Sequence, residues 1–501
     1  MRASGILMPI ASLPSKYGIG CFDKAAYKFV DTLAEAKQSY WQILPIGPTG
    51  YGDSPYQSFS TFAGNPYSID LNELVERGYL TRRSLNKYDF GDNEAAIDYE
   101  KIYYAKFAAL REAFDNSDVV NEQEFKDFCK EQKWLDDYAL YMAVKNSFDG
   151  KSFAEWDDDI RTRQPEAVKE YRKKYKEDYD FYCFLQYIFF DQWKRLKAYA
   201  NEKGISIIGD IPIYVAYDSA DCWANPELFE LDEERNPIDV AGCPPDAFSA
   251  TGQLWGNPLY KWDYHKKTGY KWWIERIRVC YQLYDVIRID HFRGFDEYYA
   301  IPFGEETAVN GEWRPGPGID LFKAIEKKLG KMRIIAEDLG FITDTVRELL
   351  EATGFPGMKV LQFAFDSREE SDYLPHNYTA NSVVYTGTHD NDTIQGWLKA
   401  IAKEDLKLAK NYMNLPKLDK ENAHWDFICM AMRSVSDTCI IPIQDYLGLG
   451  SEARINTPST VGSNWTWRMD KKGLDKKTIR KIALITKICG RCREAEESAQ
   501  D

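Results

Sequence analysis

The chain has 501 residues, with 64 Lys and Arg against 79 Asp and Glu, which gives a formal net charge of −15 at pH 7. This acidic balance argues against nucleic acid or an anionic membrane as a partner, because both surfaces repel a negatively charged protein. Hydrophobic residues make up 44% of the chain and charged residues 29%, a composition that excludes a largely disordered protein. Aromatic residues are abundant at 15%, which predicts either a large core or surfaces on which a ligand stacks.

The sequence carries neither a signal-peptide pattern nor a membrane-spanning stretch. Pro9 interrupts the apolar run near the N-terminus, and no run approaches the ~18 apolar residues of a membrane span. Most of the ten cysteines stand alone in apolar stretches, as reduced thiols do, so we expect a cytoplasmic protein. Cys489 and Cys492 have the spacing of a metal or redox motif, but no second pair lies near them, and we interpret the spacing as coincidence.

Eight short apolar runs, rich in β-branched residues, are typical of strands buried on both faces of a parallel sheet. They are residues 5–10, 40–46, 205–213, 285–290, 332–339, 358–365, 382–390 and 438–445. Helical patterns separate several of them; the one over 343–354 has Thr343 as its N-cap and Gly354 as its end. Eight strands alternating with helices predict an α/β fold, the (β/α)8 TIM barrel, rather than an open doubly wound sheet.

The uneven spacing of the runs predicts two insertions. A large one follows the second strand, where charged, helix-period segments predict a mainly helical subdomain over residues 50–190. A second insertion, residues 214–284, follows the third strand. It contains a Gly- and Pro-rich stretch, 241–260, that we expect to form a substrate loop. The catalytic barrel would then comprise residues 1–49 and 191–501.

Four carboxylates lie at the ends of four predicted strands: Asp210, Asp290, Glu337 and Asp390. The active site of a TIM barrel lies at the carboxyl ends of its strands, so we expect these side chains on one rim. Carboxylates gathered there repel one another, which argues for a function rather than for stability. For each one alone, capping of the next helix is the alternative. We expect Asp210 to support the site rather than to react.

The fourth predicted strand ends in Arg288-Ile289-Asp290, and residues i and i+2 of a strand share a face. A guanidinium beside a carboxylate favours the ionised form, so we expect a lowered pKa for Asp290, as a nucleophile requires. Glu337 follows an apolar strand, and we expect burial to raise its pKa, as a proton donor requires. Paired carboxyl groups in unlike environments point to glycosidic-bond chemistry.

Several motifs resemble those of the 4-α-glucanotransferase family, the amylomaltases or disproportionating enzymes. They are RIDHFRGF (288–295), AEDLG (336–340), GTHDNDT (387–393) and residues 47–66, 209–215 and 244–260. The resemblance spans nearly the whole chain. It implies a barrel enzyme related to the α-amylases, without cofactor or metal. Such an enzyme breaks an α-1,4 link in a maltooligosaccharide and passes the glycosyl piece to the 4-OH of another glucan or of glucose.

The resemblance also implies roles for individual residues. Asp290 corresponds to the nucleophile that forms a covalent glycosyl-enzyme, Glu337 to the general acid/base, and Asp390 to a carboxylate that steadies the transition state. Tyr51 corresponds to a tyrosine linked in some members to a second glucan site, and Asn464 to a loop over the acceptor side. The implied substrate-binding residues are Arg288, His389, Tyr56, Asp246, Gln253, Trp255, Asn464 and Tyr51. Core packing is the alternative for each aromatic residue.

Two other functions stay open on the sequence alone. A hydrolase would use the same carboxylates and pass the same intermediate to water, and whether loops such as 244–260 exclude water decides between the two. A divalent-metal enzyme would use Asp210, Asp290 and Glu337 as ligands, and full activity after exhaustive chelation would exclude it. The expected partners are α-1,4-glucans and maltooligosaccharides, with no nucleic acid and no membrane. The sequence does not indicate whether the protein is a monomer or an oligomer.

Overall fold

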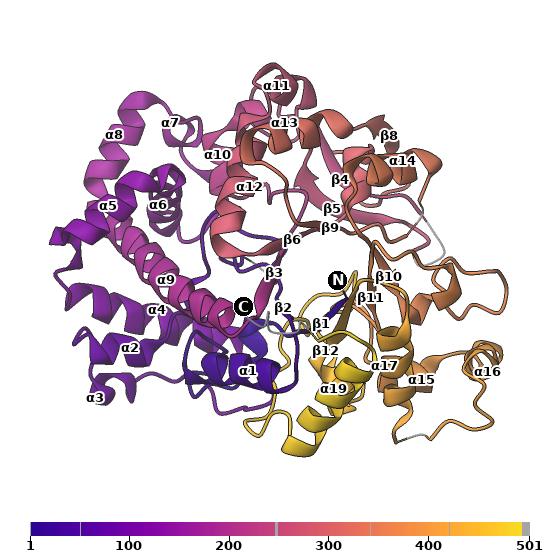
Figure 1. The fold of residues 1–501 in the computed structure, drawn as a ribbon. Coiled ribbons are helices and arrows are strands. Elements are labelled where there is room, and N and C mark those ends of the chain that lie inside the picture. The colour runs from indigo at the N-terminus through magenta and orange to yellow at the C-terminus, as the bar shows by residue number, and fades with distance from the viewer. Residues whose placement is uncertain (1, 51, 246–248, 341, 420, 493–501) are drawn as a thin grey trace, which may run out of the picture.

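The computed structural model describes residues 2–50, 52–245, 249–340, 342–419 and 421–492. Eight parallel strands form a nearly closed barrel at its centre, in the order β10-β11-β12-β1-β2-β3-β6-β9 (Figure 1). They are β1 (Ala3–Leu7), β2 (Tyr40–Gln42), β3 (Ser206–Ile211), β6 (Val286–Ile289), β9 (Ile334–Ala336), β10 (Gly357–Val360), β11 (Ser382–Tyr385) and β12 (Thr438–Pro442). Beside the open edge, the Ala336 N–H donates to the Pro356 carbonyl at 3.0 Å. Each predicted run overlaps one of these strands, so the predicted barrel is confirmed.

Strand residues alternate between two apolar layers, because successive side chains of a strand point to opposite faces. One cluster takes side chains from all eight strands and fills the inside of the barrel; it includes Tyr40, Ile208, Val286, Ile335, Met358 and Val383. The residues next to them in sequence pack outward against the helices, among them Trp41, Ile207, Ile287 and Ile334. Burial on both faces explains why these strands read as continuous apolar runs.

Helices surround the barrel between its strands (Figure 1). They are α1 (Lys24–Glu35), α9 (Lys176–Glu202), α12 (Lys271–Leu283), α13 (Ile319–Leu329), α14 (Asp344–Thr353), α15 (Ile394–Ala400), α16 (Lys403–Tyr412), α17 (Ala423–Arg433), α18 (Ile443–Leu447) and α19 (Lys476–Ile488). Helix α14 begins and ends as predicted: the Thr343 side chain accepts from the Val346 N–H, and Gly354 follows in the left-handed region at φ +70°. Among the described residues, no helix is both long and apolar enough to cross a membrane.

The segment between β2 and β3 is mainly helical, as the charged helix-period pattern predicts, and lies on one side of the barrel (Figure 1). Its helices are α2 (Leu71–Glu76), α3 (Arg82–Leu85), α4 (Tyr99–Asp115), α5 (Gln123–Glu131), α6 (Lys133–Ser147), α7 (Asp158–Arg161) and α8 (Pro165–Lys174). Helix α9 closes the segment and leads back into the barrel at β3. The buried face of α9, which includes Phe184, Phe189 and Trp193, belongs to the same core as the outer face of the barrel.

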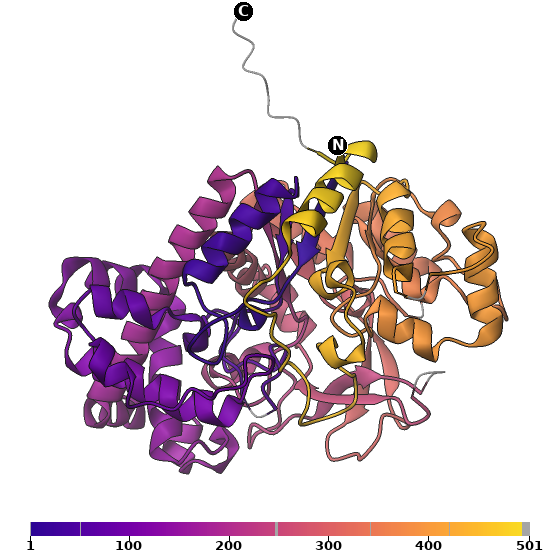
Figure 2. The same cartoon turned by 90° about the horizontal axis from the view of Figure 1, so that it is seen from below.

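A second, antiparallel sheet lies beyond the carboxyl ends of the barrel strands (Figure 2). Its order is β5-β4-β7-β8, with β4 (Asp239–Cys243), β5 (Gln253–Pro258), β7 (Glu297–Pro302) and β8 (Glu312–Pro315); the short helices α10 (Ala220–Ala224) and α11 (Trp262–Lys267) lie nearby in the chain. The expectation of a loop throughout 241–260 is therefore wrong. Gly252 and Gly256 have positive φ at +70° and +76°, and the β4–β5 register shifts between Val240 and Gly242, so the glycines shape an irregular strand pair.

Candidate active site

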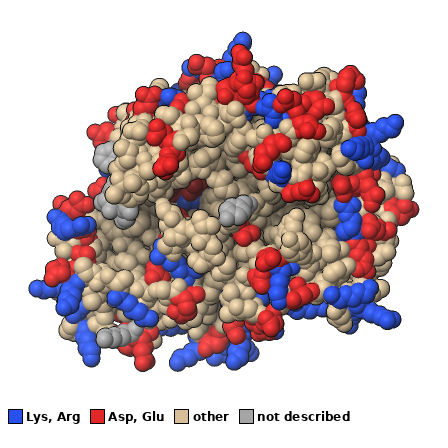
Figure 3. Space-filling view, turned by 180° about the vertical axis from the view of Figure 1, so that it is seen from behind, with Lys and Arg blue, Asp and Glu red and all other residues tan. Residues whose placement is uncertain are grey.

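The expected carboxylates lie where their strands end. Asp290 directly follows β6 and Glu337 directly follows β9, and these two strands are paired. Asp390 lies in the loop after β11, between Thr386 and the first residue of α15. Figure 3 views the end of the barrel toward which the strands run, where the surface is hollowed near its middle and acidic and basic atoms lie inside the hollow.

Arg288 binds two carboxylates at the carboxyl ends of their strands, Asp210 and Asp290. Its side chain is only 3% exposed, and its Nη1 donates to both carboxylate oxygens of Asp210, at 2.7 and 2.6 Å. Its Nη2 donates to Asp290 Oδ1 at 3.0 Å, which confirms that Arg288 and Asp290 share a strand face. Burial by itself would lower the pKa of Arg288, but Asp210 and Asp290 hold it well above its usual value. Asp210 is fully buried and accepts a further bond from the Tyr56 hydroxyl at 2.8 Å, a supporting position as expected.

The pKa of Asp290 differs from the sequence-based expectation. Burial raises it, and Arg288 lowers it, but Asp210 and Asp390 raise it again, so that the net value is about 6. The expectation of a lowered pKa was wrong because it counted the guanidinium without the desolvation and the two neighbouring carboxylates. At neutral pH the group is still mainly ionised. Its side chain keeps 29% of its surface exposed, so it can contact a ligand at the carboxyl end of β6.

Glu337 has the raised pKa expected of a proton donor. Burial is the largest cause and the neighbouring Asp290 is the next, and together they bring the pKa to about 7. Two backbone N–H groups hold the carboxyl in place: Oε2 accepts from His291 at 2.7 Å and Oε1 from Leu339 at 2.8 Å. His291 adopts a left-handed conformation at φ +51°, which directs its N–H toward Glu337. The two carboxyl groups thus differ in their partners, one bound to a guanidinium and the other to amides.

Asp390 is the most ionised of the three carboxyl groups. Burial acts to raise its pKa, but His389 and the Asn456 amide outweigh burial and hold the pKa at about 2. His389 Nε2 lies 3.2 Å from Asp390 Oδ2, and Asn456 Nδ2 donates to Oδ1 at 2.6 Å. Burial acts to lower the pKa of His389, but the effect of Asp390 is larger and opposite. The net pKa of His389 therefore lies above its usual value. Because 42% of the Asp390 side chain stays exposed, its negative charge remains accessible to a ligand.

Aromatic side chains flank these groups on two sides. Tyr56 stacks on the His389 ring with centroids 5.1 Å apart and an interplanar angle of 18°, and Trp465 lies 5.9 Å from each of these two rings. On strand β5, the Trp255 indole N–H donates to Gln253 Oε1 at 3.0 Å, and its ring meets that of His291 edge-on at 4.8 Å. Both Gln253 and Trp255 remain half-buried, which leaves surface for a ligand.

Asn464 shapes its own loop. Its amide bonds with Thr457 and Thr460, including a donation from the Thr457 N–H to Oδ1 at 3.0 Å. The next residue, Trp465, has φ +65° and carries its ring toward Tyr56 and His389. Two further expected residues, Tyr51 and Asp246, lie outside the described residues.

Two supporting residues were missed by the sequence reasoning. Asn456 holds Asp390 through the bond described above. Asp445 accepts from the Thr386 hydroxyl and, at 2.8 Å, from the Ile394 N–H, so it ties together both ends of the loop that carries Asp390. Burial raises the pKa of Asp445 to about 6. Only its position at the end of a predicted strand could have pointed to it.

The described residues do not form a metal site. Among them, no group of three or more His, Cys, Asp or Glu side chains is arranged to hold a metal ion. Asp210, which the metal hypothesis needs as a ligand, has its carboxylate bound by Arg288 and Tyr56 instead.

Known proteins resemble this chain over nearly its whole length. A family model described as 4-alpha-glucanotransferase matches residues 8–474. The 4-alpha-glucanotransferase of Clostridium butyricum is 51% identical over 488 residues, covering 97% of this chain and 100% of the relative. That of Thermus thermophilus is 46% identical, covering 93% and 95%. The structure of an amylomaltase from Streptococcus agalactiae in complex with acarbose matches with a TM-score of 0.95 and 44% identity, covering 98% of this chain and 100% of that one. The chain belongs to the 4-alpha-glucanotransferase family.

Proposed function

We propose that this protein is a 4-α-glucanotransferase that moves segments of α-1,4-glucan between maltooligosaccharides by a retaining mechanism. The observation that carries the proposal is the pairing of two unlike carboxyl groups on neighbouring strands: Asp290 against the Arg288 guanidinium and Glu337 on two amides. Membership of the family and the likeness to an acarbose-bound amylomaltase support it.

In the first half of the reaction, the Asp290 carboxylate attacks the anomeric carbon of the donor sugar. The bond from that carbon to the glycosidic oxygen breaks, and Glu337 gives its proton to this oxygen, so the shortened glucan leaves with a free 4-OH. The raised pKa of Glu337 keeps a large fraction protonated near neutral pH, while Arg288 helps to keep Asp290 ionised. The product of this half is a glycosyl ester on Asp290.

In the second half, Glu337 acts as a base. Its carboxylate takes the proton from the 4-OH of the acceptor, whose oxygen attacks the anomeric carbon and displaces Asp290. The acceptor is another glucan or glucose. The two inversions together retain the α configuration, and both carboxyl groups return to their starting states.

Asp390 and His389 steady the sugar as positive charge develops on it. The transition state resembles an oxocarbenium ion, so a carboxylate that stays ionised lowers its free energy. The low pKa of Asp390 meets this requirement. The imidazole of His389 is only 3% exposed and contacts Asp390, so its main role here is to hold that carboxylate ionised and in place.

The aromatic groups give the sugar its binding surfaces. A glucose ring has an apolar C–H face, which packs on an aromatic ring, and polar hydroxyls, which need a few aimed hydrogen bonds. Tyr56 and Trp465 would hold sugar next to Asp390, while Trp255 and Gln253 would hold it next to Glu337. We keep Asp246, Asn464 and Tyr51 as proposed sugar-binding residues on the resemblance alone.

The hydrolase is the competing function, because it shares the first half-reaction. Incubation with maltotriose separates the two. Transfer yields glucose together with longer maltooligosaccharides and no gain in reducing ends, whereas hydrolysis yields shorter sugars and one new reducing end per bond cleaved. We expect the transfer pattern, and a gain in reducing ends equal to the bonds broken would replace the proposal by the hydrolase.

We also propose that the chain divides as the sequence predicts, into a barrel of residues 1–49 and 191–501 and a helical subdomain of residues 50–190. The series of helices α2–α8 supports a helical subdomain, but the expected boundary at residue 190 falls inside α9 (Lys176–Glu202), which runs on without a break toward β3. The second insertion, expected over residues 214–284, contains only β4 and β5 of the antiparallel sheet. Strands β7 and β8 of the same sheet follow Asp290 in the chain. The cytoplasmic location stays a prediction.

A further inference from the structure

A cavity of about 340 Å³ opens at the end of the barrel opposite to the carboxylates. Its lining includes the first residues of four barrel strands, namely Tyr40, Val286, Ile334 and Thr438. Asp290 and Glu337 follow the last residues of two of these same strands, so the length of the barrel separates the cavity from the active site. We call this cavity the basal pocket. Its volume lies within the range of small-molecule sites, about 300–1,000 Å³.

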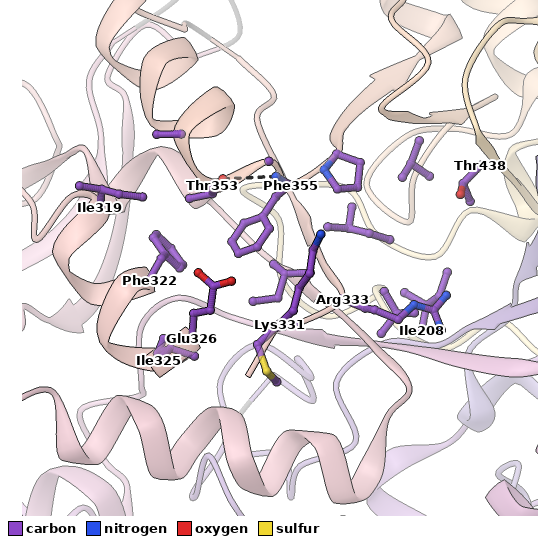
Figure 4. Close-up of a pocket in the computed structure, with 18 of the residues that line it drawn as sticks. Ile208, Ile319, Phe322, Ile325, Glu326, Lys331, Arg333, Thr353, Phe355 and Thr438 are labelled. Carbon is purple, nitrogen blue, oxygen red and sulfur yellow. Dashed lines mark hydrogen bonds between the residues drawn. The ribbon is translucent and has the colours of Figure 1, made fainter. Parts of the chain in front are cut away.

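One wall of the basal pocket is apolar and aromatic (Figure 4). Phe322 of α13 and Phe355, which follows α14, meet edge-to-face with ring centroids 5.4 Å apart. Ile319 and Ile325 extend this wall along α13. Such a surface can pack against the flat or aliphatic body of a ligand.

Charged side chains surround this wall, and they are mostly basic. Lys323, Lys331 and Arg333 line the pocket together with a single acid, Glu326. Figure 4 shows Glu326, Lys331 and Arg333 among the apolar side chains of the pocket. Arg333 Nη2 donates to the Tyr40 hydroxyl at 2.8 Å, which anchors this guanidinium. The side chains of Lys323, Lys331 and Glu326 form no hydrogen bond or ion pair within the described part of the chain.

The lining of the basal pocket is net positive, although the whole chain has a formal net charge of −15. Within the described part of the chain, Lys331 and Arg333 form no ion pair with a carboxylate, whereas Lys323 also interacts electrostatically with Asp320. Lys331 and Arg333 therefore remain available to an anion beside the apolar wall. A guanidinium and ammonium groups bind carboxylate and phosphate oxygens well, and the aromatic wall holds an apolar body.

We propose that the basal pocket binds a small amphipathic anion, an organic carboxylate or phosphate with an aromatic or aliphatic body. The body packs on Phe322 and Phe355, and the anionic group lies against Lys331 and Arg333. Because the pocket and the catalytic carboxylates lie at opposite ends of the strands, such a ligand and a glucan bind at the same time.

The test measures binding of two anions, 4-phenylbutyrate and phenyl phosphate, by isothermal titration calorimetry. The neutral 4-phenylbutanol serves as the matched ligand without charge. Either anion should bind with one site per chain and at least tenfold more tightly than the alcohol, and the tighter of the two identifies the carboxylate or the phosphate as the preferred group. Saturating acarbose should leave the affinity unchanged within twofold.

Charge reversal locates the site. Lys331→Glu and Lys323→Glu should each weaken binding of the better anion about tenfold. Lys328→Glu, on helix α13 like Lys323 but outside the pocket, should change it less than twofold. Transfer activity and circular dichroism serve as folding checks, since none of the three lysines lies near the catalytic groups. Equal binding of anion and alcohol, displacement by acarbose, or equal losses in Lys331→Glu and Lys328→Glu would each overturn the proposal. A Lys331→Glu variant that fails to fold leaves Lys323→Glu to decide.

Discussion

Changing the pH acts in opposite directions on the two carboxyl groups that we assign to bond cleavage. The productive free enzyme has Asp290 ionised and Glu337 protonated. The fraction in this state rises as pH passes the pKa of Asp290, about 6, and falls as it passes that of Glu337, about 7. The plot of kcat/KM against pH should therefore be a narrow bell centred near pH 6.5, whose limbs report the pair of groups.

The two pKa values set the width of this bell. With limbs at about 6 and 7, roughly 60% of the enzyme is in the productive state at pH 6.5. At pH 4.5 and at pH 8.5 the fraction falls to roughly 3%, a loss of about twentyfold on either side. Glucose release from maltotriose, measured from pH 4 to pH 9 at constant ionic strength, gives the profile. A plateau from pH 5 to pH 9, or two limbs both below pH 5, would refute the reasoning.

The Glu337→Gln variant separates the limbs. α-Maltosyl fluoride needs no proton on its leaving group, so this variant should still release fluoride in a first turnover, but without the alkaline limb. The acidic limb should stay near pH 6, because Arg288 and Asp210 still surround Asp290. Persistence of an alkaline limb near pH 7 in this variant would assign that limb to a group other than Glu337.

Three substitutions test further parts of the site. Asp290→Asn should fold normally and lose transfer by several orders of magnitude, since an amide cannot form the glycosyl ester; activity within about tenfold of the parent would exclude Asp290 as nucleophile. Trp255→Ala should raise the ratio of hydrolysis to transfer by roughly five- to hundredfold, if a lost stacking contact is worth about 1–3 kcal/mol to the acceptor alone; glucose released against reducing ends gained measures this ratio, and an unchanged ratio would assign Trp255 to packing. Asp445→Asn should lower kcat about tenfold with little change in KM and reduce the free energy of unfolding by about 1–3 kcal/mol, because one of the bonds to Thr386 or Ile394 is lost; unchanged kcat with reduced stability would limit Asp445 to a structural role.

The barrel could be predicted from the sequence because its strands are buried on both faces. Continuous apolar runs follow from that burial, and the carboxyl ends of the strands then locate Asp290 and Glu337 without further information. The antiparallel sheet could not be predicted in this way. Strand β5 (Gln253–Pro258) is short and half-exposed and contains Gly256 at a positive φ, so it has neither the apolar run nor the regular alternation of a strand.

The electrostatics of the site depend on residues that only the fold brings together. Arg288 is two positions from Asp290 and could be anticipated. Asp210, which accepts from Arg288, comes from β3, 78 positions before Arg288 in the sequence. Asn456 reaches Asp390 from 66 positions away. The sequence around Asp290 is therefore enough to predict that Arg288 lowers its pKa, but not to predict the net value, which burial, Asp210 and Asp390 raise.

The most direct measurement is the trapping of the glycosyl-enzyme. In Glu337→Gln, α-maltosyl fluoride should form the ester on Asp290, and the loss of the base at position 337 should slow its transfer to an acceptor. Rapid quenching in acid, peptic digestion and mass spectrometry should find one maltosyl unit on the peptide that contains Asp290, and none in the Glu337→Gln, Asp290→Asn double variant. A maltosyl unit on another carboxyl group, or fluoride release without any adduct under the same conditions, would contradict the account.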